Sequence, residues 1–178
     1  MIDLPRQPVV RGHPLHAMLS DLPIGLLPAA IASATLAAGR RKRSPLRRGA
    51  DVLATMTLAA GASAAAAGVW DWLGIPRSHP AWWPATIHGA INLTNVAALG
   101  AAVAMPARRL PIYGAVAAGM LVSGWLGGEL VFTHGWRVRP AEEYEQLVER
   151  LEPDDQAAVA DARSVVEQYE REETFLPR

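Results

Sequence analysis

Long uncharged segments alternate with short polar ones along this chain. The uncharged segments are residues 22–39, 52–70, 81–107 and 110–128. An α-helix needs about 20 mainly apolar residues to cross the hydrocarbon core of a bilayer, and each segment reaches that length with its flanking residues. The pattern therefore predicts four membrane-spanning helices. They cover approximately residues 16–39, 50–73, 83–105 and 110–133.

The four segments differ from soluble helices and from strands. Ala, Leu, Val and Gly fill them without the strict alternation of a half-buried strand. A soluble helix needs a polar face, and residues 58–69 carry almost none. We therefore expect an all-α protein in which residues 1–139 form an integral membrane, up-and-down four-helix bundle. The first segment is expected to be retained, because its basic cluster follows the apolar run instead of preceding it.

Charge divides the chain near its C-terminus. The formal net charge is zero, yet residues 1–140 contain five acidic residues and the last 38 contain 12, with four arginines. Residues 140–178 are therefore expected to form an acidic, helical tail outside the membrane. This tail is either a solvated appendage or a docking surface for a cationic partner, such as a soluble electron carrier. No basic face accompanies a soluble fold, which argues against nucleic acid as a partner.

The basic residues predict how the chain is oriented. Cytoplasmic loops of membrane proteins carry an excess of Lys and Arg. Six of these residues lie between the first two spans, Arg108 and Arg109 lie between the last two, and the middle loop has only Arg77. We expect a multi-pass protein of a bacterial inner membrane, surrounded by the lipid bilayer, with both termini on the outer side.

Ionisable and amide residues gather at the predicted outer end. They are His13, His16, Asp21, Asp71, His88, Asn92, Glu129 and His134. His88 and Asn92 are four residues apart and share one helix face. Charged groups within a membrane are costly and usually face the bundle interior or a wet cavity. The arrangement predicts one outward-facing His/carboxylate pocket, whereas Asp51, at the inner start of the second span, is expected to interact with the helix dipole.

Most of these residues would also suit a purely structural role. His13 beside Pro14 fits a helix start, and Asp71 between two tryptophans fits a helix end at the membrane surface. Asn92 fits an interhelical hydrogen bond, which is worth about 0.6 kcal/mol in membranes. A structural role suits His88 less well, because an unpaired imidazole inside an apolar span is costly.

Several motifs carry a family resemblance that covers roughly residues 10–140. They are His13-Pro14-Leu15-His16, Leu19-Ser20-Asp21-Leu22-Pro23-Ile24-Gly25, Asp71-Trp72-Leu73, His88-Gly89-Ala90-Ile91-Asn92 and Gly124-Trp125-Leu126-Gly127-Gly128-Glu129-Leu130-Val131. The chain resembles a bacterial family of four-helix membrane proteins of unknown function, found alone or fused to Rieske iron–sulfur domains. The resemblance implies a link to electron transfer through this association alone.

The chain has no cysteine, so Cys nucleophiles, thiolate zinc sites and Cys-ligated iron–sulfur clusters are excluded. Imidazole is a good axial ligand for b-type haem, which fits between membrane helices. We expect His16 and His88 to bind haem from opposite sides, with His134 and then His13 as the alternative ligands. Asp21, Asp71, Asn92 and Glu129 are expected to line the pocket. The corresponding function is electron transfer, with a redox partner protein on the outer side.

Three rival functions for the polar cluster stay open. Zinc or copper could bind His16, His88 and His134 together with a carboxylate. Protons could move along a carboxylate–histidine path, although the inner halves of the spans offer few polar groups for it. The polar cluster could also serve only to hold the bundle together. The sequence leaves open whether the protein is an enzyme and what its oligomeric state is.

Overall fold

A computed structural model describes residues 9–10, 13–41, 43–136 and 160. The chain forms two compact units, residues 1–130 and residues 131–178. All four long helices belong to the first unit except for the last two residues of the fourth. The expected acidic tail, residues 140–178, lies outside the described residues apart from Ala160.

Four long helices dominate the described part of the chain. They are α1 (Leu15–Ala37), α2 (Pro45–Leu73), α3 (Trp82–Ala104) and α4 (Arg109–Phe132). A short 3-10 helix, η1 (Pro106–Arg108), leads into α4. Two-residue strands β1 (Val9–Val10) and β2 (His13–Pro14) pair antiparallel before α1. Each long segment is apolar enough to cross a membrane, which confirms the expected four-helix membrane fold.

Local sequence determines where α1 ends and α2 begins. Gly39 adopts a positive φ of 73° just after α1, a conformation that glycine enters without a Cβ clash. Ser44 then caps α2, because its side-chain oxygen accepts a hydrogen bond from the backbone N–H of Arg47 at 3.3 Å. Pro45 suits the first helical position, where its missing N–H is no loss. As a result α2 begins five residues earlier than the expected residue 50.

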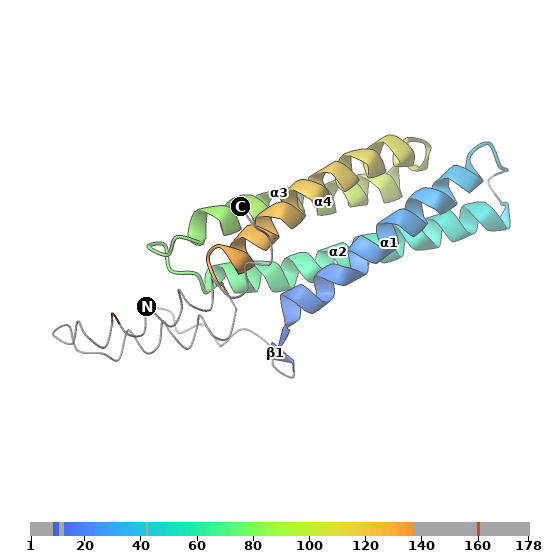
Figure 1. The fold of residues 1–178 in the computed structure, drawn as a ribbon. Helices are drawn as coiled ribbons and strands as arrows, with labels where there is room; N and C mark the ends of the chain where they lie inside the picture. Colours follow the sequence, from blue (N-terminus) through green and yellow to red (C-terminus); the bar gives the residue numbers. More distant parts are fainter. Residues whose placement is uncertain (1–8, 11–12, 42, 137–159, 161–178) are drawn as a thin grey trace, which may run out of the picture. The chain divides into compact units, whose positions relative to one another are not determined.

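The helices of the first unit run up and down in chain order (Figure 1). The α1–α2 loop and the α3–α4 turn lie at one end of the bundle, and the α2–α3 corner lies at the other. This connectivity brings the starts of α1 and α3 to the same end as the final turns of α2. His16, Asp71 and His88 therefore lie toward the same end of the bundle.

Alanine and aliphatic side chains, together with one tyrosine, form the bundle core. The buried cluster consists of Leu27, Ala30, Leu99, Ala102, Tyr113 and Val116, from α1, α3 and α4, with Leu53 and Leu58 of α2 packed against it. A Cβ added at Gly61 would lie only 3.3 Å from Cδ1 of Leu99. The glycine therefore lets α2 and α3 approach closely, as small residues commonly do in membrane helix pairs.

The outer surface of the bundle is apolar. Only 11–22% of each candidate span is buried within the protein. Large apolar side chains such as Leu121 and Trp125 are 78% and 68% exposed. A soluble monomer rarely exposes continuous apolar surface on this scale, whereas a bilayer covers it with lipid.

An ion pair fastens the end of the bundle that carries the basic loops. Arg109 is buried at the first position of α4, and its Nη1 lies 2.7 Å from Oδ1 of Asp51 on α2. Its Nε–H also donates to the carbonyl of Ala102 on α3 at 2.9 Å. The expected role of Asp51 at a helix dipole is therefore wrong. Because α2 begins at Pro45, Asp51 lies in its second turn and faces an arginine from another helix.

Candidate functional site

His16 connects α1 to the backbone of α2. Its Nδ1–H donates to the carbonyl oxygen of Ala64 at 2.9 Å. A Cβ added at Gly68 would lie 2.8 Å from Cε1 of the imidazole, so the ring occupies the space that a side chain there would need. Gly68 is the residue whose N–H bonds to the Ala64 carbonyl within a regular helix. The missing side chain thus lets the imidazole reach a carbonyl that is already part of the helix.

His88 makes the same kind of contact between α3 and α4. Its Nδ1–H lies 2.9 Å from the carbonyl oxygen of Ser123 and 3.1 Å from the Ser123 hydroxyl. A Cβ added at Gly127 would lie 3.3 Å from Cε1 of the ring. Each histidine thus binds a carbonyl four residues before a glycine on the following helix. We call these two contacts the histidine clips.

The two clips bring their imidazoles together. The ring centres of His16 and His88 are 6.1 Å apart, and the ring planes are nearly perpendicular at 86°. A carbonyl can only accept a hydrogen bond, so each Nδ1 carries the proton. In the neutral form of each ring, Nε2 then keeps its lone pair, which is the state required of a metal-binding imidazole.

Asn92 completes the surroundings of His88. Its side-chain Nδ2 lies 3.0 Å from Nε2 of His88, one helical turn away on α3. With the proton on Nδ1, the amide donates and Nε2 accepts. Both ring nitrogens of His88 are therefore hydrogen-bonded.

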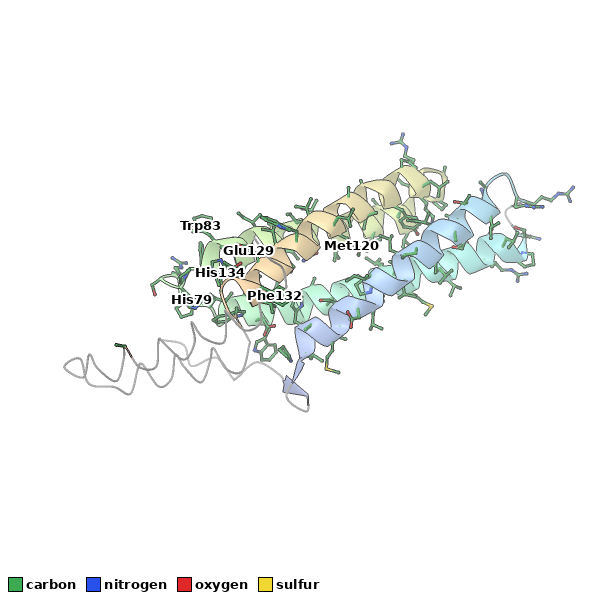
Figure 2. All side chains as sticks on the ribbon, viewed as in Figure 1. His79, Trp83, Met120, Glu129, Phe132 and His134 are labelled. Atoms are coloured by element: carbon green, nitrogen blue, oxygen red, sulfur yellow. The ribbon has the colours of Figure 1, made fainter. Side chains whose placement is uncertain are left out.

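The remaining expected pocket residues occupy different positions. Asp21 is exposed on α1, five residues after His16 and about 140° around the helix from it. Asp71 is half-buried near the end of α2. Glu129 is half-buried near the end of α4 (Figure 2). His13 belongs to β2, and its side chain lies outside the described part. The roles of these four residues in binding a cofactor stay predictions.

His134 lies in the second unit, at residues 131–178, and its pairing with the bundle histidines also stays a prediction. Among the described residues, no group of three or more His, Asp or Glu side chains is placed to hold a metal ion. The structure therefore offers two imidazoles in contact with each other, without the third protein ligand of a typical zinc site.

A tryptophan cluster joins the end of α2 to the start of α3. The indole N–H of Trp72 on α2 donates to Oγ1 of Thr86 on α3 at 2.9 Å, and this hydroxyl donates to the carbonyl of Trp82 at 2.7 Å. The Trp82 and Trp83 rings meet edge to face with centres 4.9 Å apart. Trp83 is 66% exposed and points away from the helices (Figure 2). This placement suits an indole at a membrane surface.

The part of the chain that forms the bundle matches a known protein family. The family described as "Predicted membrane protein (DUF2231)" matches residues 12–140, which is more than half of the chain. The chain belongs to this family. This membership confirms the resemblance to a membrane-protein family of unknown function and makes the chain a predicted membrane protein. The association with Rieske domains stays a prediction. Comparisons with curated proteins and with solved structures found no match.

The partners of the two clip histidines are not visible in the side-chain pattern of the sequence. Gly68 and Gly127 each provide the space for an imidazole on the backbone, whereas the sequence alone indicates only small residues between helices. The acceptors themselves are the main-chain carbonyls of Ala64 and Ser123, which no side-chain pattern reveals. The sequence signal that could have indicated these contacts is a glycine on the helix that follows each histidine.

Proposed function

We propose that the protein binds a redox-active metal centre between His16 and His88 and transfers electrons through it, and that this centre is b-type haem. The observation that supports the proposal is the meeting of two imidazoles, both held by Nδ1, with ring centres 6.1 Å apart. A metal bound in line between the two Nε2 atoms, with metal–nitrogen bonds of about 2.0–2.1 Å each, would set the ring centres about 6 Å apart.

The number of ligands favours haem over a bare ion. Haem iron needs only axial ligands from the protein, and imidazole is among the commonest. Zinc prefers three or four protein ligands, and no such group occurs among the residues that the structure describes. His16 and His88 would hold the iron, and the bound centre would supply one-electron exchange.

Further residues of the chain would orient the two ligands. The carbonyls of Ala64 and Ser123 fix both rings through Nδ1, and such outer contacts raise the basicity of a metal-binding imidazole. Ligation at Nε2 of His88 would replace the hydrogen bond from Asn92. The Asn92 amide would then be free to turn toward another acceptor.

A structural role is the second candidate, and the Asn92 contact is the observation that favours it. Here the histidine clips only fasten α1 to α2 and α3 to α4, and Asn92 satisfies the remaining nitrogen of His88. Hydrogen bonds between membrane helices contribute about 0.6 kcal/mol on average. This candidate requires no cofactor.

An absorbance spectrum distinguishes the haem centre from the structural role. The protein is expressed with added haem precursor and solubilised in detergent. We expect a Soret band that shifts on reduction with dithionite, and its loss in His16→Ala and His88→Ala. His79→Ala is the matched control, because His79 belongs to the α2–α3 turn, where its Nδ1 accepts from the N–H of Ala81. A wild-type protein without a Soret band excludes haem. Stoichiometric copper or zinc in that sample would assign the pair to a bare ion, and no metal would leave the structural role.

The proposal places the histidine pair toward the outer face of a bacterial inner membrane. The loops at the opposite end of the bundle carry Arg40, Arg41, Arg43 and Arg108, and basic loops favour the cytoplasm. Both termini would then lie outside, where a redox partner protein would meet the bundle.

A further inference from the structure

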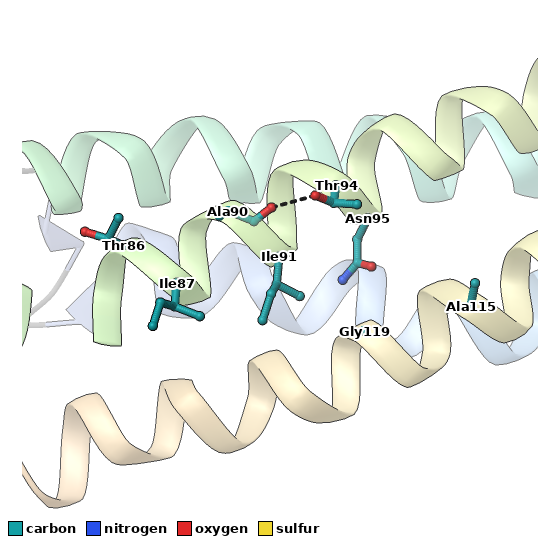
Figure 3. Close-up of a pocket in the computed structure, with 8 residues that line it drawn as sticks. All are labelled: Thr86, Ile87, Ala90, Ile91, Thr94, Asn95, Ala115 and Gly119. Atoms are coloured by element: carbon teal, nitrogen blue, oxygen red, sulfur yellow. Dashed lines mark hydrogen bonds between the residues drawn. The ribbon is translucent and has the colours of Figure 1, made fainter. Parts of the chain in front are cut away.

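A groove of about 450 Å³ lies between α3 and α4 (Figure 3). Its lining includes Ile87, Ala90, Ile91 and Asn95 of α3, and Ala115 and Gly119 of α4. The volume falls within the range of about 300–1,000 Å³ that small-molecule sites occupy. The groove is therefore large enough for a small organic ligand.

One polar group in the groove has no partner. Asn95 is 7% exposed, and its Nδ2 forms no hydrogen bond with any described residue. Its amide extends from α3 toward Gly119 of α4, where it occupies the space of the missing side chain (Figure 3). A buried donor without an acceptor costs about 1–3 kcal/mol, so the position favours a ligand that brings an acceptor.

The two threonines nearby are already bonded. The Thr86 hydroxyl donates to the Trp82 carbonyl, and the Thr94 hydroxyl donates to the Ala90 carbonyl. Asn95 therefore provides the polar contact of the groove, and the isoleucines and alanines provide an apolar wall. This combination is suited to an apolar molecule that carries a hydrogen-bond acceptor.

The depth of Asn95 in the membrane indicates which class of ligand could pair with it. Asn95 is 13 residues from Trp82, or about 20 Å along α3, so it lies near the middle of a core about 30 Å thick. The ester carbonyls of phospholipids lie at the edge of that core, about 15 Å from its centre. An acyl chain in the groove would leave the Asn95 donor unpaired. A membrane-dissolved ring with its own carbonyl group would pair it.

We propose that the α3–α4 groove binds a lipid-soluble quinone, with a ring carbonyl accepting a hydrogen bond from Nδ2 of Asn95. The ring lies against Ile91 and Gly119, and the apolar tail runs past Ile87 toward the lipid. Neither His16 nor His88 lines the groove. The inference is therefore independent of the proposed metal centre, and either one can fail without the other.

Binding of decylubiquinone to the detergent-solubilised protein tests the proposal through quenching of tryptophan fluorescence. We expect saturable binding, weakened about 10-fold in Asn95→Leu, which removes one neutral hydrogen bond. Ala115→Leu should weaken it more than 10-fold, because Ala115 is exposed and lines the groove. Ala97→Leu is the matched control on an exposed position of α3 outside the groove, and it should stay within twofold of wild type.

Several outcomes would overturn the proposal. If wild-type protein shows no saturable binding of decylubiquinone, a quinone site is excluded. If dodecylbenzene, which has no carbonyl, displaces decylubiquinone as well as unlabelled quinone does, the groove binds lipid chains. If the protein is a dimer that becomes a monomer in Ala115→Leu while quinone binding is unchanged, the groove is an interface between two copies of the chain. If Asn95→Leu does not fold by circular dichroism, Ala115→Leu and Ala97→Leu still decide the result.

Discussion

Two glycines act at the scale of single residues, because each leaves the space in which an imidazole meets a helix backbone. His16 lies against Gly68, and His88 lies against Gly127. Glycine in a helix interior usually costs about 0.5–1 kcal/mol relative to alanine. The imidazole contact offsets this cost, and an alanine Cβ would clash with His16 at Gly68 and would tightly contact His88 at Gly127.

Gly68→Ala is therefore expected to destabilise the protein, although alanine is the better helix former. The new Cβ would lie 2.8 Å from Cε1 of His16, so the ring must leave its position against Ala64. We expect a lower unfolding temperature in detergent. Gly89→Ala is the control, because a Cβ there has nothing within 4 Å, and it should be neutral or stabilising. Equal effects of the two changes would contradict the described position of His16.

At the scale of elements, side-chain contacts near helix ends hold neighbouring helices together. The hydroxyl oxygen of Thr86 accepts a hydrogen bond from the indole N–H of Trp72, and this contact joins the end of α2 to the start of α3. Asp51 and Arg109 join α2 to α4 near the opposite end. The first contact links successive helices and the second links helices that are separated by α3, and the sequence does not show how either pair meets.

Thr86→Val should weaken the α2–α3 corner while preserving the size of the side chain. The Trp72 indole loses its acceptor, and a typical hydrogen bond contributes about 0.5–1.5 kcal/mol. We expect a lower unfolding temperature and altered tryptophan fluorescence. Thr55→Val is the control, since the exposed Thr55 hydroxyl donates only to the Asp51 carbonyl of its own helix. A similar change in Thr55→Val would argue against a specific role for the corner.

Asp51→Asn should destabilise the protein because it leaves the Arg109 guanidinium buried without its counter-ion. Asp51 itself is 58% exposed, so the loss should lie between the about 1 kcal/mol of an exposed pair and the about 3 kcal/mol of a buried one. Chemical denaturation in detergent measures it. The double variant Asp51→Asn, Arg109→Met should recover part of the stability, and an additive loss would show that the pair is not coupled.

At the scale of the whole molecule, the distribution of charge predicts the orientation in the membrane. The α1–α2 loop and the α3–α4 turn share one end of the bundle and are rich in arginine. The opposite end carries the tryptophan corner and the histidine pair. Positive loops favour the cytoplasm, so the whole first unit should have a single orientation.

Reporter fusions measure this orientation. A reporter that is active only outside the cytoplasm should work after Arg178 and fail at Ser44, and a cytoplasmic reporter should behave in the opposite way. Replacement of Arg40, Arg41, Arg43, Arg47 and Arg48 by Gln should weaken the preference, because these residues supply most of the positive charge of the α1–α2 loop and of the first turn of α2. A cytoplasmic C-terminus in the unmodified protein would reverse the proposed location of the histidine pair.

The sequence by itself determined the four spans, because the length and hydrophobicity needed to cross a bilayer are properties of each segment. It also indicated that His16 and His88 would enter the bundle from one end, since up-and-down connectivity alone requires this. The acceptors of the clips, the ion pair of Asp51 and the exposed position of Asp21 were decided only by the tertiary structure. Main-chain carbonyls have the same chemistry at every residue, and the side chain that reaches one depends on how two helices are rotated and packed.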